Sequence, residues 1–400
     1  MRVTQTVFAV FHHFELAHQL QRRGHLAKIY STWPWARLKR EGLPKEFVET
    51  FATLHTATTL LGRTGRLPVS ADTFLNKWNT LTFDNWTARR IAPCDALISI
   101  SGSGLKTGRK VQREGGKFIC DRGSTHQRYQ EQIVAAEHKR WNVPPPYEKP
   151  HIVVREEAIY EQADAISVPS TVAARSFIAM GIPAEKLHVI PYGVRLDKFK
   201  PTAVPDSSRF DVLFAGAIGL RKGVPYLLEA FARVKHPNKH LTFVGAVQDD
   251  LRSVLPRLPQ QHVTFTGTLS QPELAARMSA SHVMVLPSIE EGLALVQGQA
   301  MACGCPVIAT RATGSEDLFT HDVEGFIVPE RDIDALATRM QQIAGDPALR
   351  QRLSEACLRR VKSLGGWDRY GDLWDDLLHT LTGLPRDPGE PDYIEPDYIL

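Results

Sequence analysis

Residues 282–310, HVMVLPSIEEGLALVQGQAMACGCPVIAT, hold two short apolar segments on either side of a run of small residues. The segments HVMVLPS (282–288) and CPVIAT (305–310) are β-branched and bounded by glycine or proline, as buried parallel strands are. The small residues between them predict a helix. The whole stretch therefore predicts a strand–helix–strand unit, the building block of a parallel sheet that is covered by helices on both faces.

The same alternation extends through most of the chain, which predicts an α/β fold class. Helical patterns separate the apolar segments, for example at residues 171–181, where a Ser170/Thr171 cap precedes the helix and Gly181 follows it. The other expected strands are residues 7–11, 96–101, 117–121, 165–170 and 187–194 in the first half, and 211–216, 241–246, 263–267 and 325–329 in the second half.

A linker divides the two halves. Residues 196–210, LDKFKPTAVPDSSRF, carry two prolines and several polar residues between strand patterns. Because 400 residues suit two domains, we expect a first domain over residues 1–200 and a second over 201–365. A helical segment over 332–363 and an amphipathic helix over 365–381 follow. The proline-rich acidic tail, residues 384–400, repeats EPDYI and is expected to be disordered.

Composition excludes several classes of protein. A net charge of +4 does not indicate a nucleic-acid partner, and no apolar run approaches the length of a membrane helix. The apolar run at 7–11 is too short for a signal peptide, and five scattered cysteines without a CxxC pair argue against disulfides or a zinc site. We therefore expect a cytoplasmic protein. The basic segment 20–66, which also contains Trp33 and Trp35, predicts either peripheral contact with an anionic membrane surface or a solvated basic face.

Two strand-to-helix turns in the second half carry candidate binding residues. In FAGAIGLRKG (214–223), Gly216 lets the backbone approach a ligand, and Arg221 and Lys222 offer donors to phosphate oxygens, although such a pair can also be merely solvated. In EEGLALVQGQ (290–299), a helix start offers free N–H groups and a positive dipole end to an anion. Glu291 and Gln299 are eight residues apart, about two helical turns, so we expect one at the mouth of the site and the other along the same face; an acid at a helix start can also simply cap it.

Together these motifs resemble the family-4 retaining glycosyltransferases, also called glycosyl transferases group 1. The resemblance rests on residues 287–310, FAGAIGLRKGVPYLLEAF and ADAISVPSTVAARSFIAMGIPAEKLHVIPYGV, and extends from about Glu156 to Ser363. It implies a GT-B fold, in which two Rossmann-like domains face each other across a cleft and the last helix crosses back to the first domain. It also implies transfer of a sugar, with retention of configuration, from a UDP- or GDP-sugar to a glycan, lipid-linked or small-molecule acceptor.

The resemblance assigns roles to residues at matching positions. Glu291 would contact the hydroxyls of the donor sugar, and Arg221 and Lys222 would neutralise the leaving diphosphate. Gly267 lies in a loop that would shape selectivity for base and sugar. The diphosphate would be held by backbone amides of the segment Gly292, Leu293, Ala294, Leu295 and Val296.

Three positions depart from the family pattern. The acid that usually holds the ribose is Gln299 here, an amide that can still donate and accept hydrogen bonds but carries no charge. The arginine after the first glycine is Ala217, and Arg221 is the expected substitute. His12 and His13 replace a pair of glycines near the N-terminus, which alters the acceptor-side loop.

Two loops of the first half are also expected to face the cleft, one around Gly102 and one over residues 121–126. Related proteins often carry a histidine after the second of these strands that touches the transferred sugar, and His126 is the candidate. The alternative is a loop histidine whose hydrogen bonds are satisfied. Asp332 and Asp334 match an Asp-x-Asp metal motif but stand at a helix start, where capping explains them. We therefore expect a metal-independent enzyme without a cofactor.

Two other functions remain open at this stage. A sugar-nucleotide epimerase of GT-B fold would use the same donor site without an acceptor. A non-catalytic glycosyltransferase-like subunit would bind nucleotide and support a partner, and Gln299 is the residue that favours this interpretation.

Overall fold

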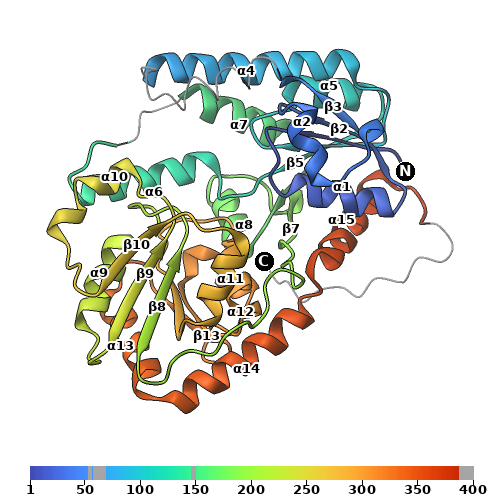
Figure 1. Ribbon diagram of the computed structural model, residues 1–400. Helices are drawn as coiled ribbons and strands as arrows, with labels where there is room; N and C mark the ends of the chain where they lie inside the picture. The colour runs from blue at the N-terminus through green and yellow to red at the C-terminus, as the bar shows by residue number, and fades with distance from the viewer. Residues whose placement is uncertain (53–55, 57–68, 146–149, 387–400) are drawn as a thin grey trace.

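The computed structural model describes residues 1–52, 56, 69–145 and 150–386 (Figure 1). Two α/β units lie one beside the other, each built on a sheet whose strands all pair in parallel. The two-domain α/β architecture expected from the sequence is therefore confirmed. Strand β7 (Leu187–Val189) ends the first sheet and β8 (Phe210–Ala215) begins the second, so the proposed boundary at 200/201 lies between them.

Within the described residues, the first sheet has seven strands in the order β3-β2-β1-β4-β5-β6-β7. Its remaining strands are β1 (Val3–Val7), β2 (Leu26–Ser31), β3 (Val48–Thr50), β4 (Ala96–Ile100), β5 (Lys117–Asp121) and β6 (Ala165–Val168). Its helices are α1 (His13–Arg22), α2 (Trp35–Leu38), α4 (Val69–Arg90), α5 (Leu105–Arg113), α6 (Gln127–Arg140), α7 (Pro150–Gln162) and α8 (Thr171–Ala179).

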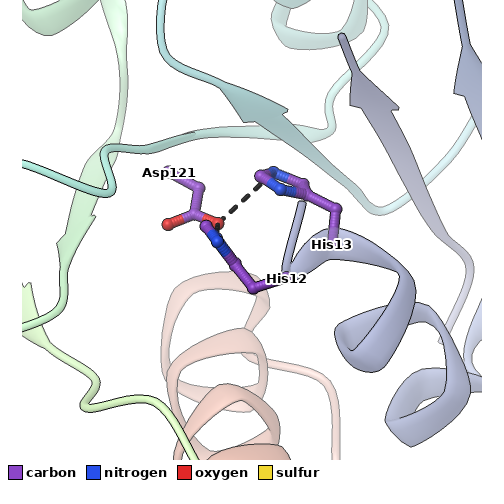
Figure 2. A group of neighbouring side chains, drawn as sticks. All are labelled: His12, His13 and Asp121. Atoms are coloured by element: carbon purple, nitrogen blue, oxygen red, sulfur yellow. Dashed lines mark hydrogen bonds and ion pairs between the residues drawn. The ribbon is translucent and has the colours of Figure 1, made fainter. Parts of the chain in front are cut away.

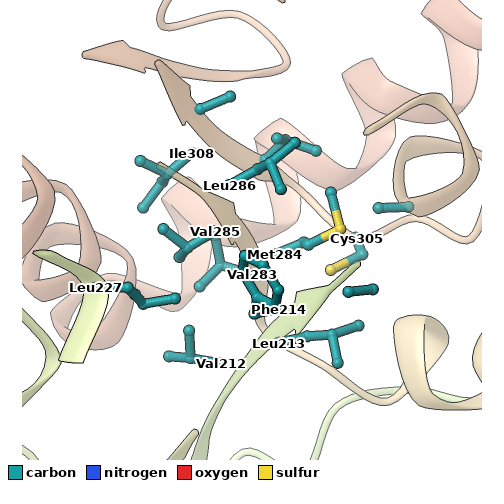
Figure 3. Close-up of a cluster of buried hydrophobic side chains, with 14 of the residues drawn as sticks. Val212, Leu213, Phe214, Leu227, Val283, Met284, Val285, Leu286, Cys305 and Ile308 are labelled. Carbon is teal, nitrogen blue, oxygen red and sulfur yellow. The ribbon is translucent and has the colours of Figure 1, made fainter. Parts of the chain in front are cut away.

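The second sheet has six strands among the described residues, in the order β10-β9-β8-β11-β12-β13. Its remaining strands are β9 (Lys239–Val244), β10 (Val263–Gly267), β11 (Val283–Leu286), β12 (Val307–Thr310) and β13 (Gly325–Val328). Its helices are α9 (Val224–Arg233), α10 (Asp249–Arg252), α11 (Gln271–Ser279), α12 (Leu295–Ala302), α13 (Ile333–Gly345) and α14 (Pro347–Ser363). Strands β8 and β11 are buried on both faces, and Figure 3 shows their side chains packed against helices and neighbouring strands.

In both sheets the strand order reverses, at the β1/β4 pair and at the β8/β11 pair. Loops at the carboxyl ends of such strands diverge and leave room for a ligand. The two turns that the sequence singled out, after β8 and after β11, therefore flank the reversal point of the second sheet.

The last helix, α15 (Gly366–Thr382), belongs to the core of the first domain, as expected. Tyr370, Trp374 and Leu378 are buried in one cluster with residues of α1 and β1. Figure 1 shows α14 leading away from the second sheet and α15 returning to α1. Gly193 permits this crossing, because a Cβ there would overlap the backbone of Trp367.

Several expected bounds are wrong. The first strand covers Val3–Val7 rather than 7–11, because the chain turns after Val7, where Ala9 and Phe11 have positive φ angles of 60° and 41°. The helical segment 332–363 is two helices, separated at Asp346, whose side chain caps α14. Strands β2 and β3 were not expected.

The basic segment, where the structure describes it (residues 20–52 and 56), makes several contacts with its own domain. Trp33 and Trp35 pack against the first-domain core, and Arg37 lies over the Trp33 ring at 3.9 Å. Arg22 and Arg23 form ion pairs with acids of α15. These contacts favour a solvated face, and membrane contact stays a prediction. Among the described residues, no helix combines the length and apolarity that a bilayer crossing requires. The expected tail lies outside the described residues from 387 onward.

Candidate active site

The two turns of the second domain contact each other. Gly223, at the entrance of α9, has a φ of +67°, and a Cβ there would overlap the carbonyl oxygen of Pro287 after β11. Only glycine combines this backbone conformation with so close an approach. The contact brings Arg221 and Lys222 of one turn beside Glu290 and Glu291 of the other.

These four side chains form a compact charged cluster. Lys222 Nζ is paired with Glu291 Oε2, and Arg221 Nη1 lies 3.4 Å from the same oxygen. Arg221 Nη1 also lies 3.2 Å from Glu290 Oε2 and donates to the Glu290 carbonyl oxygen at 2.9 Å. The structure thus brings together Glu291, Arg221 and Lys222, the three charged residues that the sequence selected in this domain.

The surroundings shift the pKa values of the two cations in opposite directions. Burial lowers the pKa of Lys222, although Glu291 opposes the shift. Burial also acts against the charge of Arg221, but Glu291 and Glu290 outweigh it and raise the pKa of the guanidinium. The two cations lie close together beside one partly exposed carboxylate. The cations can bind a diphosphate, and the carboxylate can bind a hydroxyl-rich group next to it.

Glu290 connects this cluster to the first domain, a role that sequence reasoning missed. Its Oε1 accepts hydrogen bonds from Thr125 Oγ1 at 2.6 Å and Ser124 Oγ at 3.0 Å, and its Oε2 accepts from Gln130 Nε2 at 2.9 Å. Burial would raise the pKa of Glu290, but Arg221 and these hydrogen bonds together hold it below the ordinary value. The pair of adjacent acids at 290–291 was the sequence signal available for this role. It could not identify the partners of Glu290, because they lie about 160 residues away in the chain.

Further contacts hold the two domains together beside the cluster. A Cβ on Gly292 would overlap the carbonyl oxygen of Gly123, so glycine is required where the loops meet. Ser170 Oγ donates to the Gly292 carbonyl oxygen at 2.5 Å. Asp317 accepts from Thr171 N at 3.0 Å and from Thr171 Oγ1 at 3.0 Å, and so caps α8 from the opposite domain.

The start of α12 lies directly after this contact. Leu293 and Ala294 are buried, and Leu295 and Val296 form the first turn, whose N-cap residue Ala294 provides no side-chain hydrogen bond. Glu291 precedes the helix, so Glu291 and Gln299 do not share a helix face as the spacing had suggested. Gln299 lies half-buried on α12.

Three other glycines were expected to contribute to the site, and each of them has a positive backbone φ angle. Gly216 (φ 147°) directly follows β8 and Gly267 (φ 75°) is the last residue of β10, both at the carboxyl edge of the second sheet. Gly102 (φ 85°) follows β4 in the first domain, and its carbonyl oxygen accepts from Arg155 Nε at 2.8 Å.

His126 does not join the cluster. It is the N-cap of α6, its Nδ1 accepts from Arg128 N at 3.2 Å, and only 2% of the residue is exposed. Its ring packs against Tyr160 and Phe177 with centroid distances of 5.0 and 5.1 Å. Burial lowers the pKa of His126 to about 4, so the ring is neutral near pH 7. These contacts favour the structural interpretation of this histidine.

Other first-domain histidines lie beside the contact between the domains instead, since a Cβ on Gly123 would lie 3.6 Å from His12 Cε1. Figure 2 shows His12 and His13, at the start of α1, directed toward Asp121 at the end of β5. His12 Nε2 lies 2.7 Å and His13 Nε2 lies 3.3 Å from Asp121 Oδ2, while Ser167 Oγ donates to Oδ1 at 2.8 Å. Burial lowers the pKa of His13 to about 3.

The Asp-x-Asp motif is explained as expected for Asp332, which caps α13 by accepting from Ala335 N at 2.8 Å, whereas Asp334 pairs with Arg233.

Comparison with known proteins agrees with this geometry. Residues 197–360 match the sequence model of the family described as Glycosyl transferases group 1. Over 234 residues the chain is 31% identical to the D-inositol 3-phosphate glycosyltransferase of Pseudarthrobacter chlorophenolicus, which covers 54% of this chain and 56% of that protein. The chain thus spans little more than half the length of this relative.

Solved structures share the fold over nearly the whole chain. Sucrose-phosphate synthase from Thermosynechococcus elongatus superposes with a TM-score of 0.70 at 20% identity, over 96% of this chain and 100% of that one. HepE from Anabaena, solved in complex with UDP-glucose, gives a TM-score of 0.66 at 18% identity over 96% and 100% of the two chains. At these identities the likeness shows the common GT-B fold.

Proposed function

Because residues 197–360 match the sequence model of the glycosyl transferases group 1 family, we propose that the chain is a retaining glycosyltransferase that uses a UDP- or GDP-sugar. The acceptor is a hydroxyl group of a glycan, a lipid-linked saccharide or a small molecule, and the product belongs to polysaccharide or glycoconjugate synthesis. The observation that carries the proposal is the cluster of Arg221, Lys222 and Glu291 at the carboxyl edge of the second sheet, opposite the first domain.

The cluster suits the loss of a nucleoside diphosphate from an anomeric carbon. Negative charge grows on the β-phosphate as the bond from the anomeric carbon to oxygen breaks, and fixed cations aimed at that charge lower the barrier. Arg221 and Lys222 supply these cations, and the uncapped start of α12, at Leu295 and Val296, supplies further N–H donors, whereas the Ala294 N–H already donates to the Thr313 carbonyl oxygen at 3.2 Å. Glu291 then accepts hydrogen bonds from the sugar hydroxyls.

The transfer step balances without a base from the protein. The acceptor oxygen forms the new bond to the anomeric carbon on the face that the leaving group vacates, and a phosphate oxygen takes the acceptor's proton. The products are the glycoside and the nucleoside diphosphate. Gln299 would hold the ribose through its amide, and Gly216 and Gly267 would let the backbone approach the nucleotide base.

The first domain would bind the acceptor. The loop between β1 and α1 contains two non-glycine residues with positive φ, Ala9 and Phe11, and such strained positions gather at functional sites. His12 lies in the same loop, and Gly102 belongs to a neighbouring one. The five cysteines are all free, which fits a reducing cytoplasm. The basic segment would allow peripheral contact with the inner membrane surface if the acceptor is lipid-linked.

Release of nucleoside diphosphate from a panel of UDP- and GDP-sugars tests the proposal. A transferase should hydrolyse its donor slowly without an acceptor, in the presence of EDTA, at a temperature well below its melting point. Conversion of the donor to an isomer without release would identify an epimerase. Binding of the nucleoside diphosphate without any turnover would identify a non-catalytic subunit, and dependence on magnesium or manganese would overturn metal independence.

A further inference from the structure

A second cluster of ionisable side chains lies where α15 meets the first domain. His25 immediately precedes β2, at the amino edge of the sheet, and Asp375 and His379 are one helical turn apart on α15. His25 Nε2 lies 3.0 Å from Asp375 Oδ1, and His379 Nε2 lies 3.6 Å from Asp375 Oδ2. One ligand atom from each residue lies within 4.8 Å of the other two.

These side chains are buried, but each of them has a polar atom without a hydrogen-bond partner. The side chains of His25, Asp375 and His379 are 6%, 10% and 10% exposed. Within the described part of the chain, His25 Nε2, Asp375 Oδ1 and His379 Nε2 make no hydrogen bond of acceptable geometry. Buried polar atoms without partners are costly, so their convergence on one point requires an explanation.

The hydrogen bond on the far side of His379 fixes which nitrogen faces the cluster. His379 Nδ1 lies 2.8 Å from the carbonyl oxygen of Leu384. A carbonyl oxygen can only accept, so Nδ1 carries the hydrogen, and the neutral ring presents the lone pair of Nε2 to the Asp375 carboxylate. Two acceptors then face each other. Imidazoles that bind metals have this arrangement, in which the other N–H is donated to a carbonyl group.

We propose that His25, Asp375 and His379 bind a divalent transition metal, with Zn²⁺ as the best fit. Two imidazole nitrogens and a carboxylate oxygen suit zinc, and water would complete a tetrahedron. Bonds of about 2.0–2.1 Å give ligand–ligand separations of about 3.3 Å, between the two distances observed. The metal would link α15 to the first sheet and would have a structural role.

The backbone around His25 is suited to such a role. Its N–H donates to the Leu20 carbonyl oxygen at 2.8 Å, and its carbonyl oxygen accepts from Val3 N at 2.8 Å. The ligand is therefore held between α1 and β1 before any metal binds. His25 Nδ1 lies 3.4 Å from the N-terminal amino group, so that group must turn away or accept the Nδ1 hydrogen when Nε2 binds a metal. The other triad, at the cleft, differs because His12 Nε2 already makes a direct 2.7 Å hydrogen bond to Asp121.

Metal binding by the full chain tests the proposal. Protein stripped with chelator is titrated with Zn²⁺ and, for its visible absorption, with Co²⁺. The variants are His25→Gln and His379→Gln, with His240→Gln in the second domain as the matched control and His13→Gln to report on the cleft. The wild type should bind one more equivalent of Zn²⁺ than either ligand variant, whose affinity should fall at least about a hundredfold.

Stability and spectra give independent readouts. Zn²⁺ should raise the melting temperature of the wild type and of His240→Gln, but not of the ligand variants, since only a metal-binding native state is stabilised. If a ligand variant folds poorly, Asp375→Asn, which keeps the shape of the side chain, should still lose the Co²⁺ absorption. Chelation should lower the melting temperature without stopping donor hydrolysis, because His25 lies at the amino edge of its sheet.

Unchanged zinc stoichiometry in His25→Gln and His379→Gln would overturn the proposal. So would loss of the metal in His13→Gln together with its retention in His379→Gln, which would assign it to the cleft. Failure of the wild type to bind Zn²⁺ would leave a simple imidazolium–carboxylate pair and would equally refute the site.

Discussion

Thr125 Oγ1 of the first domain donates a 2.6 Å hydrogen bond to Glu290 Oε1 of the second. The other oxygen of the same carboxylate lies 3.2 Å from Arg221 Nη1. One buried group therefore connects the interface between the domains with the cations of the candidate site. The two adjacent glutamates therefore have different partners: Glu290 contacts both domains, whereas Glu291 pairs with Lys222 and Arg221 within the second domain.

Glu290→Ala should loosen the interface and disturb Arg221. The change leaves the buried hydroxyl of Thr125 without an acceptor, at about 1–3 kcal/mol, and removes one of the two acceptors of Gln130 Nε2. Glu290→Gln keeps an acceptor for Thr125 and should cost less. Melting temperature and small-angle X-ray scattering would measure this, with an opening of the domains expected for Ala. Equal stability of wild type, Gln and Ala variants would contradict the bridging role.

Lys222→Ala should reduce donor hydrolysis and transfer by roughly 10²–10³-fold, the scale for losing one donor to a developing oxyanion. Its melting temperature should change little, since the removed ammonium is buried at a cost. Lys235→Ala, on the exposed surface of the same domain, is the control and should retain full activity. Near-normal turnover of Lys222→Ala would remove this residue from the site.

Gln299 separates an active enzyme from a binding subunit. If its amide holds the ribose, Gln299→Glu should bind nucleoside diphosphate at least as well, because a charged hydrogen bond contributes about 1.5–3 kcal/mol against 0.5–1.5 for a neutral one. Gln299→Leu should weaken binding of the same nucleotide. Calorimetry measures both. Normal affinity of the Leu variant would show that this side chain does not face the ribose.

Asp317 should make stability depend on pH. Burial raises its pKa from 3.8 to about 6 in spite of the bonds from Thr171. The folded state therefore binds a proton more tightly than the unfolded state, so the contribution to stability is full below about pH 4 and is lost as pH rises through about 6. It amounts to about 3 kcal/mol at most.

Replacing the carboxyl group removes this titration. Asp317→Asn should gain in melting temperature relative to wild type between about pH 4.5 and pH 7.5, because the variant has no proton to lose there. Asp322→Asn, at a largely exposed position, should show no such drift. A constant difference between Asp317→Asn and wild type over this range would refute the assignment.

Trp374→Ala should destabilise the first domain although it lies near the end of the chain. Removing a fully buried indole costs about 3–5 kcal/mol, and the lost contacts are with α1 and β1. Deleting α15 should unfold that domain, whereas ending the chain after Arg386 keeps the bond between His379 and Leu384. Val204→Ala is an exposed control. Unchanged melting of both domains after deletion of α15 would contradict this packing.

The sequence predicted those features whose signals are local. KFICD and VTFTG match β5 and β10 residue for residue, because each is a short apolar run between turn residues. Strand β2, LAKIYS, was missed because a lysine interrupts its apolar pattern. The break between α13 and α14 was missed because Pro347 stands in the first turn of a helix, where proline is tolerated.

The same distinction holds for the site. Two local sequence signals, the turn at 214–223 and the turn at 290–299, identified Arg221, Lys222 and Glu291. The hydrogen bond from Thr125 to Glu290 and the close approach of His25 to Asp375 join residues 165 and 350 positions apart, and no pattern of a single sequence encodes such pairings. His126 was selected by its place after a strand, but that place is also where a helix cap is needed.

The return of α15 to α1 sets the order in which the protein can mature on the ribosome. Strand β7 is complete at Val189, but the indole that closes the first core is added only at residue 374, after the entire second domain. At about 5–20 residues per second, roughly 10–40 s pass between the two events. During that interval the apolar groove beside α1 and β1 faces solvent, so the nascent first domain is a natural client for chaperones, and the second domain completes its own core first.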